Sequence, residues 1–151
     1  MDMFDTVAAS QRGAWLHLTN IATGQPAYLK GKDGEDDASK PCRIHLVGMD
    51  SPDVRKKVKR RAAQLVKRRN KNNDLTRMSE DQIIALMDDG EGNKIADATD
   101  ATIGWENLTG KDGKALEFSE ATAAWLYEAY PAIARQVAAF LEVEANFFGT
   151  A

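Results

Sequence analysis

The side chains that could bind a metal ion or act as nucleophiles are few in this chain. Cys42 is the only cysteine, and His17 and His45 are the only histidines. All three fall in segments that alternate apolar and polar residues, so we expect them on strands. A zinc site needs three or four such ligands in convergent geometry. Ordinary strand positions account for these side chains better, and we predict no metal site.

Acidic and glycine-rich stretches raise two further kinds of chemistry. Residues 33–37 hold four acids, but they lack the spaced oxygen ligands and terminal glutamate of a calcium-binding EF-hand loop. Two Gly-Lys-Asp-Gly stretches, 31–34 and 110–113, do not lie between a strand and a helix as a phosphate-binding loop does. No nucleophile has an activating base near it in the sequence. We therefore expect no catalytic residues, no cofactor and no enzyme activity.

Binding is the activity that the charge pattern favours. Residues 55–71 hold ten of the twenty Lys and Arg and no acid. Outside this segment ten Lys and Arg remain against 23 Asp and Glu, so the rest of the chain carries −13, although the formal net charge is only −3. A positive charge this concentrated indicates contact with an anionic surface.

A helix best accounts for the basic segment. Ser51 is a suitable N-cap, Pro52 suits the first helical position, and Asp53 complements the positive end of the helix dipole. At about 100° per residue the apolar side chains form one narrow stripe, which we expect to dock on the protein: Val54, Val58, Ala62, Leu65 and Val66. The predicted partner-binding cations gather on the opposite side: Lys56, Lys57, Arg60, Arg61, Lys67, Arg68 and Lys71.

Three kinds of partner could neutralise this basic face. An acidic protein, or a second copy of this chain, would pair with it directly. A nucleic acid would release counterions on binding, but the segment has no aromatic side chain to stack on bases, and the acidic remainder would repel a wrapping polyanion. The third possibility is the chain's own acids, at 36–37 or 88–89. The pattern favours a protein partner, with a small nucleic-acid-binding protein as the alternative.

The elements around this helix predict an α+β fold, in which a small N-terminal antiparallel β module precedes the basic helix and a mostly α C-terminal region. Strands are expected from residue 14, at 27–29 and at 42–47. Between them, residues 30–40 have the composition of a mobile, acidic, exposed loop.

Five helices are expected in all. After the basic helix, a capping box predicts a second from Glu80 to between 88 and 92, and weaker helical spacing covers 95–103. Ser119 caps a helix over 120–129, and Pro131 breaks it and begins the last helix, which should reach about residue 146.

We divide the chain into the β module, 1–50, and a helical region, 51–151, within one compact domain. No apolar run approaches the roughly 18 residues of a membrane span, so no membrane contact is expected.

The C-terminal third carries a more distinctive pattern. Residues 103–108, Ile-Gly-Trp-Glu-Asn-Leu, precede a glycine turn at Gly113, the stretch Leu-Glu-Phe-Ser at 116–119, and a final helix that ends in aromatic residues. This order resembles the end of tail assembly chaperones of long-tailed bacteriophages and related prophages. The β module and the basic helix are compatible with that family, and the likeness is strongest over 103–148.

The resemblance implies a non-enzymatic assembly factor. Members of that family act in the cytoplasm of the infected host cell, bind the tape-measure protein, keep its hydrophobic helices soluble, help recruit the tail-tube protein and are absent from the mature virion. Such a client requires exposed apolar surface. The residues predicted to bind it or to form the core are Trp105, Trp125, Tyr130, Phe140, Phe147 and Phe148. We also expect a homo-oligomer, in which the basic face of one copy meets acids of the next.

Overall fold

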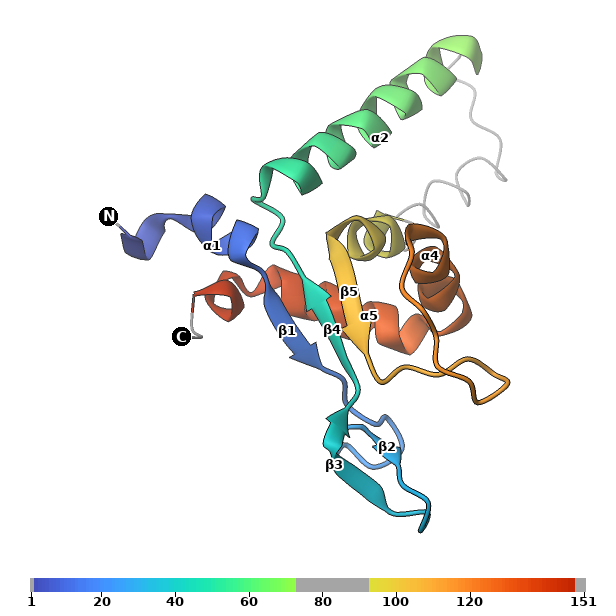
Figure 1. The fold of residues 1–151 in the computed structure, drawn as a ribbon. Coiled ribbons are helices and arrows are strands. Elements are labelled where there is room, and N and C mark those ends of the chain that lie inside the picture. The colour runs from blue at the N-terminus through green and yellow to red at the C-terminus, as the bar shows by residue number, and fades with distance from the viewer. Residues whose placement is uncertain (1, 73–92, 149–151) are drawn as a thin grey trace.

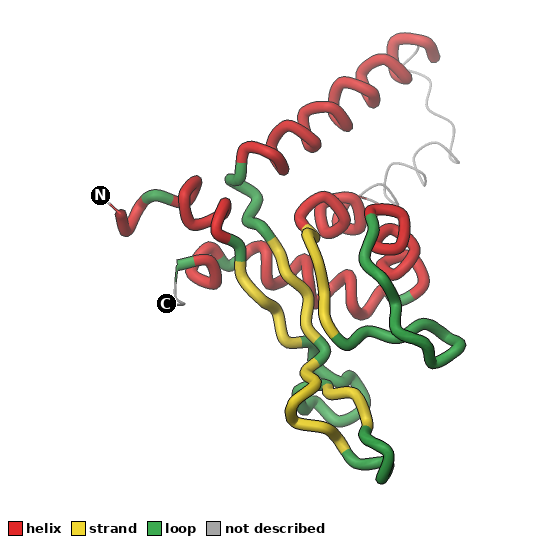
Figure 2. Tube along the Cα trace, in the orientation of Figure 1, coloured by secondary structure: helices red, strands yellow, loops and turns green. Residues whose placement is uncertain are grey.

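Helices and two small antiparallel sheets make up the part of the chain that this computed structural model describes, residues 2–72 and 93–148 (Figures 1 and 2). The predicted α+β fold is confirmed. In chain order the elements are η1 (Asp2–Phe4), α1 (Thr6–Arg12), β1 (Ala14–His17), β2 (Tyr28–Lys30), β3 (Asp36–Pro41), β4 (Arg43–Leu46), α2 (Pro52–Asn72), a helix over 93–101, β5 (Thr102–Glu106), α4 (Glu120–Ala129), α5 (Pro131–Glu142) and η2 (Glu144–Phe147).

The main sheet has the order β1-β4-β5, with β4 in the middle and both neighbours antiparallel to it. Ile44 and Leu46 of β4 alternate with Arg43 and His45, and because successive side chains of a strand point to opposite faces, one set is buried and the other is not. The buried pair packs into the same core as side chains of α4 and α5, and α5 crosses that face of the sheet (Figure 1).

The third strand of this sheet comes from the C-terminal half of the chain. Residues 102 and 103 were expected to continue a helix, and this prediction is wrong: the helix ends at residue 101 and β5 begins. Thr102 and Ile103 are β-branched and favour a strand, and pairing with β4 satisfies their backbone. The sheet is therefore not confined to residues 1–50.

A two-stranded hairpin, β2–β3, replaces the loop predicted over 30–40. Lys30 pairs with Asp36, and Gly34 takes a positive φ of 80° in the turn, a conformation that glycine adopts at little cost. Most of these residues are exposed, as predicted. Because no apolar core covers either side of β3, its sequence lacks the alternation by which a strand is recognised.

β1 and β2 do not pair with each other. They are joined by a turn in which Gly24 has a φ of 72° and only Thr19 and Pro26 form a bridge. The partner of β1 is β4.

The C-terminal helices begin and break where Ser119 and Pro131 predicted. The hydroxyl oxygen of Ser119 accepts a hydrogen bond from the backbone N–H of Thr122, and α4 gives way to α5 at Pro131. The last helix stops at Glu142, earlier than predicted, because the side-chain amide of Asn146 donates to the carbonyl oxygen of Phe140 at 2.9 Å and turns the chain into η2. The helix predicted from Glu80 lies outside the described residues.

The two ends of the described chain meet. Helix α1, which the sequence did not predict, is capped by Asp5, whose carboxylate accepts from the N–H of Ala8, and it contacts η2. The backbone of Gly48 passes so close to Ser10 that its N–H donates to the Ser10 carbonyl oxygen at 3.0 Å. Seven residues are too few for a periodic pattern, which is why α1 left no trace in the sequence.

Candidate functional site

The basic helix α2 forms where it was predicted, but its apolar stripe is buried only at the start of the helix. The Ser51 hydroxyl accepts from the N–H of Val54, and Val54 is fully buried. Val58 is half-buried, whereas Ala62 is exposed, so the predicted docking stripe is wrong from Ala62 onward within the described side chains. The side chains of Leu65 and Val66 lie outside the described set. From there α2 projects away from the sheet (Figure 1), since its stripe is too narrow and its side chains too small to hold it down.

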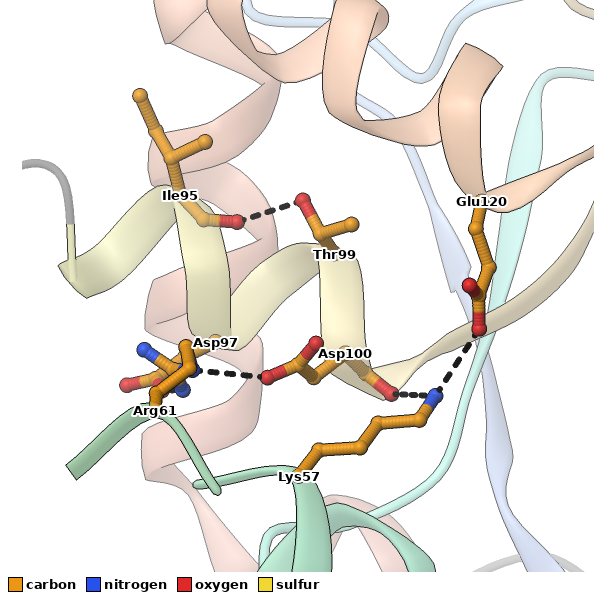
Figure 3. A network of polar contacts seen from close by, with 7 residues as sticks. All are labelled: Lys57, Arg61, Ile95, Asp97, Thr99, Asp100 and Glu120. Atoms are coloured by element: carbon orange, nitrogen blue, oxygen red, sulfur yellow. Dashed lines mark hydrogen bonds and ion pairs between the residues drawn. The ribbon is translucent and has the colours of Figure 1, made fainter. Parts of the chain in front are cut away.

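Two of the predicted cations turn inward and pair with the chain's own acids (Figure 3). The Arg61 guanidinium donates to Asp97 and, at 3.0 Å, to Asp100, both on the helix over 93–101. Lys57 Nζ lies 3.4 Å from the backbone carbonyl oxygen of Asp100 and 3.6 Å from the Glu120 carboxylate at the start of α4. A cation at the C-terminal end of a helix also complements the helix dipole. These contacts join α2 to two neighbouring helices.

The carboxyl of Asp100 is the most desolvated acid in this network. Burial raises its pKa above the ordinary value, and the positive charges of Arg61 and Lys57 offset that effect only in part. Burial penalises the charged form of a carboxyl, while a nearby cation favours it. The ion pairs thus lower the pKa of Asp100 and oppose the effect of burial.

Arg61→Gln is expected to raise the pKa of Asp100 further, because the variant keeps a hydrogen-bond donor but removes the positive charge. The free energy of unfolding should fall by only about 1 kcal/mol, since the partners are partly exposed. Carboxyl chemical shifts followed through a pH titration would test the first part, and urea unfolding the second. An unchanged titration of Asp100 would contradict the role given to Arg61. Arg60→Gln, at an exposed position on the same helix, is the matched control.

The other predicted cations do not form one face with this pair. Lys56 and Arg60 are exposed, and neither takes part in the ion pairs found among the described residues. Lys67, Arg68 and Lys71 lie on α2, but their side chains are outside the described set. The acids that meet the helix are not at 36–37, and 88–89 lies beyond the described residues.

Most of the predicted aromatic residues serve the fold. The indole N–H of Trp105 donates to the carbonyl oxygen of Leu116 at 2.7 Å, and its ring meets Phe118 edge-on. Phe118 keeps 37% of its surface exposed. The rings of Phe140 and Phe147 also meet edge-on, Phe147 is buried, and the half-buried Phe148 packs against the core.

The last two predicted aromatics, Trp125 and Tyr130, lie at the surface where α4 meets α5. Their rings are edge-on at 6.1 Å between centroids, and Trp125 is 40% exposed. Tyr130 also lines an open, mainly apolar groove of about 400 Å³. Its other apolar lining includes Leu18, Ile21, Leu29, Leu108, Leu126 and Ile133.

Side-chain hydrogen bonds fix the walls of this groove. The amide of Gln136 on α5 accepts from the Thr19 N–H at 2.8 Å and donates to the Thr19 carbonyl oxygen at 2.9 Å, as a neighbouring strand would. Gln136 was not among the residues predicted to bind a partner. Ile21, a large apolar residue at the start of the turn between β1 and β2, has 68% of its surface exposed at the groove.

Residues 103–108, on which the family resemblance rests, also reach this groove. Asn107 has a positive φ of 60°, which asparagine tolerates better than most residues, and its amide donates to the Pro41 carbonyl oxygen at 2.8 Å. This kink after β5 places both Asn107 and the buried Leu108 in the lining of the groove.

The potential metal ligands identified in the sequence have ordinary surroundings. His17 Nε2 lies 2.7 Å from the Ala27 carbonyl oxygen, His45 stacks on Trp15, and burial raises the pKa of the Cys42 thiol. Across residues 2–72 and 93–148, no three His, Cys, Asp or Glu side chains are grouped to hold an ion, and no helix is long and apolar enough to cross a bilayer.

The chain matches no family model, no curated protein and no solved structure.

Proposed function

We propose that this protein is a non-enzymatic tail assembly chaperone, which binds the tape-measure protein of a long-tailed phage in the host cytoplasm, helps recruit the tail-tube protein and is absent from the mature virion. One observation carries the proposal: Asn107 and Leu108, from the segment that resembles this family, line an open apolar groove. In this proposal the groove is where the client binds.

The shape and chemistry of the groove suit a hydrophobic helical client. A helix binds in such a groove by inserting a row of apolar side chains spaced three and four residues apart. Ile21, Leu29 and Ile133 offer an apolar surface to such a row, and Trp125 stands beside it through its contact with Tyr130. Because Gln136 holds one wall in place before binding, little ordering entropy opposes association.

The apolar side chain of Ile21 gives the sharpest test of the groove. Ile21→Asp should lower the amount of tape-measure protein kept soluble on co-expression by about tenfold, the effect of losing one well-packed apolar contact and placing a charge there. The variant should fold normally, because Ile21 is largely exposed. Soluble client in the cleared lysate, and its co-purification with a tagged chaperone, measure the effect.

Val143→Asp is the matched control. Val143 is also a β-branched residue, 49% exposed, and it is not among the groove-lining residues. It should keep the client soluble as the wild type does. Equal client recovery with both variants would contradict the groove as the binding site, and no co-purification with the wild type would overturn the proposed function itself.

A further inference from the structure

Helix α2 presents a second set of cations that face away from Asp97 and Asp100. At 100° per residue, Arg55, Lys56 and Lys59 fall within about 100° of the helix circumference, roughly opposite Arg61. All three are exposed, and the ion pairs among the described residues do not include them. Lys57 and Arg61 pair with acids of the protein itself and form the inner edge of α2. Arg55, Lys56 and Lys59 form its outer edge, where the charges are exposed.

The outer edge forms one wall of a groove against α1. This groove has a volume of about 320 Å³ and is lined by Arg55, Lys56, Lys59, Pro52, Asp50 and Val7. Figure 1 shows α1 beside the start of α2, in agreement with that lining. The cations stand on one side and an apolar side chain stands on the other.

Val7, the apolar side chain of this groove, belongs to an exposed apolar stretch near the N-terminus. Met3, Phe4 and Val7 are 77%, 70% and 40% exposed, although α1 packs against η2 on its other side. Exposed large apolar side chains gathered next to each other indicate a binding surface, whereas single ones are common on any protein. Here they lie within five residues of the chain.

We propose that the groove between α1 and α2 binds an acidic, amphipathic helical segment of another protein. Carboxylates on one side of that segment pair with Arg55, Lys56 and Lys59, and its apolar side covers Val7 and Phe4. Charge complementarity sets the orientation and the rate of association, and burial of the apolar side chains supplies affinity. This surface is distinct from the client groove, so the inference does not rest on the proposed function.

The carboxylates around this groove favour a peptide over a polyanion. Asp50 lines the groove itself, and Asp5 caps α1 beside Val7. A nucleic acid or an anionic lipid surface carries negative charge at every repeat and would be repelled by both. A helical segment has few carboxylates and can place a cation or a polar side chain opposite Asp50.

The test uses the full chain and a fluorescently labelled three-turn helical peptide, with leucines along one side and glutamates along the other. Fluorescence anisotropy should show binding that weakens as salt is added. Arg55→Glu with Lys59→Glu should reduce the affinity by about tenfold or more. Phe4→Ser should reduce it by at least about threefold at high salt, where the apolar contact dominates. Circular dichroism confirms that each variant is folded.

Lys32→Glu with Lys111→Glu is the matched control, because it makes the same change in net charge at exposed positions outside this groove. It should stay within about twofold of the wild type. Absence of peptide binding, an equal loss in the control, or equal binding of a lysine version of the peptide would overturn the inference. So would tighter binding to duplex DNA or to vesicles of anionic lipid, abolished by the same charge reversal. Ile21→Asp should leave peptide binding unchanged, which separates this surface from the client groove.

Discussion

Tyr127→Ala is expected to lower the free energy of unfolding by about 4 kcal/mol, the loss typical of a large aromatic side chain removed from a core. Tyr127 is the largest of the side chains that are fully buried among the described residues, and it stands where α4, the sheet and the helix over 93–101 share one core. The cavity left by alanine has no neighbour positioned to fill it cheaply, since the adjacent residues are held by strands and helices. Urea unfolding measures the loss. A change below about 1 kcal/mol would contradict the central place of Tyr127 in the core.

Tyr127→Phe separates packing from the hydroxyl. The Thr102 hydroxyl donates its one hydrogen to the Ala98 carbonyl oxygen at 2.6 Å, so the Tyr127 hydroxyl, also 2.6 Å away, must be the donor to Thr102. Phenylalanine keeps the ring and removes that donor, leaving Thr102 bonded to Ala98. The expected loss is therefore only about 1 kcal/mol.

The wild type and Tyr127→Phe should also differ in their response to alkali. Burial raises the pKa of Tyr127 from 10.0 to about 12. The unfolded chain releases this proton near pH 10 and the folded chain near pH 12, so the stability that Tyr127 contributes is complete below pH 10 and is lost as the pH rises through that window. Unfolding measured at several pH values should show the wild type losing more stability between pH 10 and 12 than Tyr127→Phe does. Parallel curves would contradict the raised pKa.

Gly48→Ala should cost about 3 kcal/mol, near the upper end of the usual range for overpacking. A Cβ atom at residue 48 would lie 2.6 Å from Ser10 Cβ and 2.9 Å from Ser10 Cα, and closer still to the Ser10 hydroxyl oxygen. Neither neighbour can yield easily, because the Gly48 N–H is bonded to the Ser10 carbonyl oxygen and α1 is packed on η2. The midpoint of thermal or urea unfolding gives the effect.

Two further variants make this result specific. Ser10→Gly in the Gly48→Ala background removes two of the three clashing atoms, so the double variant should be less destabilised than the sum of the single changes. Gly104→Ala on β5 is the control, because a Cβ atom there meets nothing within 4 Å. It should change stability by less than about 0.5 kcal/mol. Equal losses at the two glycines would contradict the clash as the cause, because replacing glycine by alanine lowers the entropy of the unfolded chain and should not by itself destabilise the protein.

The fold could be predicted from the sequence wherever a local pattern carried it. Ser51 and Pro52 predicted the start of α2, and Ser119 predicted the start of α4. Pro131 predicted the break before α5. Each of these signals is local, because a cap or a proline acts on the backbone next to it. β5 was missed because its strand character depends on β4, which lies about sixty residues earlier in the chain. β3 was missed because a strand exposed on both faces has no reason to alternate.

The candidate sites were only partly predictable, and for a related reason. Net charge and helical periodicity located the cations of α2, but not which of them would meet Asp97 and Asp100. That division depends on how α2 sits against the helix over 93–101, which no local pattern encodes. Likewise, Trp125 and Tyr130 were predicted to bind a client or to form the core, whereas the apolar groove beside them requires Ile21 from a distant turn.

The position of β4 has a consequence for how the protein is made. Its neighbour β1 is synthesised before it, but its other neighbour, β5, follows α2 and a long stretch of chain, and Arg43 finds its partner Glu106 at a separation of 63 residues. Pairings this far apart slow folding, because the intervening chain must be ordered before the contact is rewarded. During synthesis, the edge of β4 that pairs with β5 therefore stays unpaired until residues 102–106 have been made.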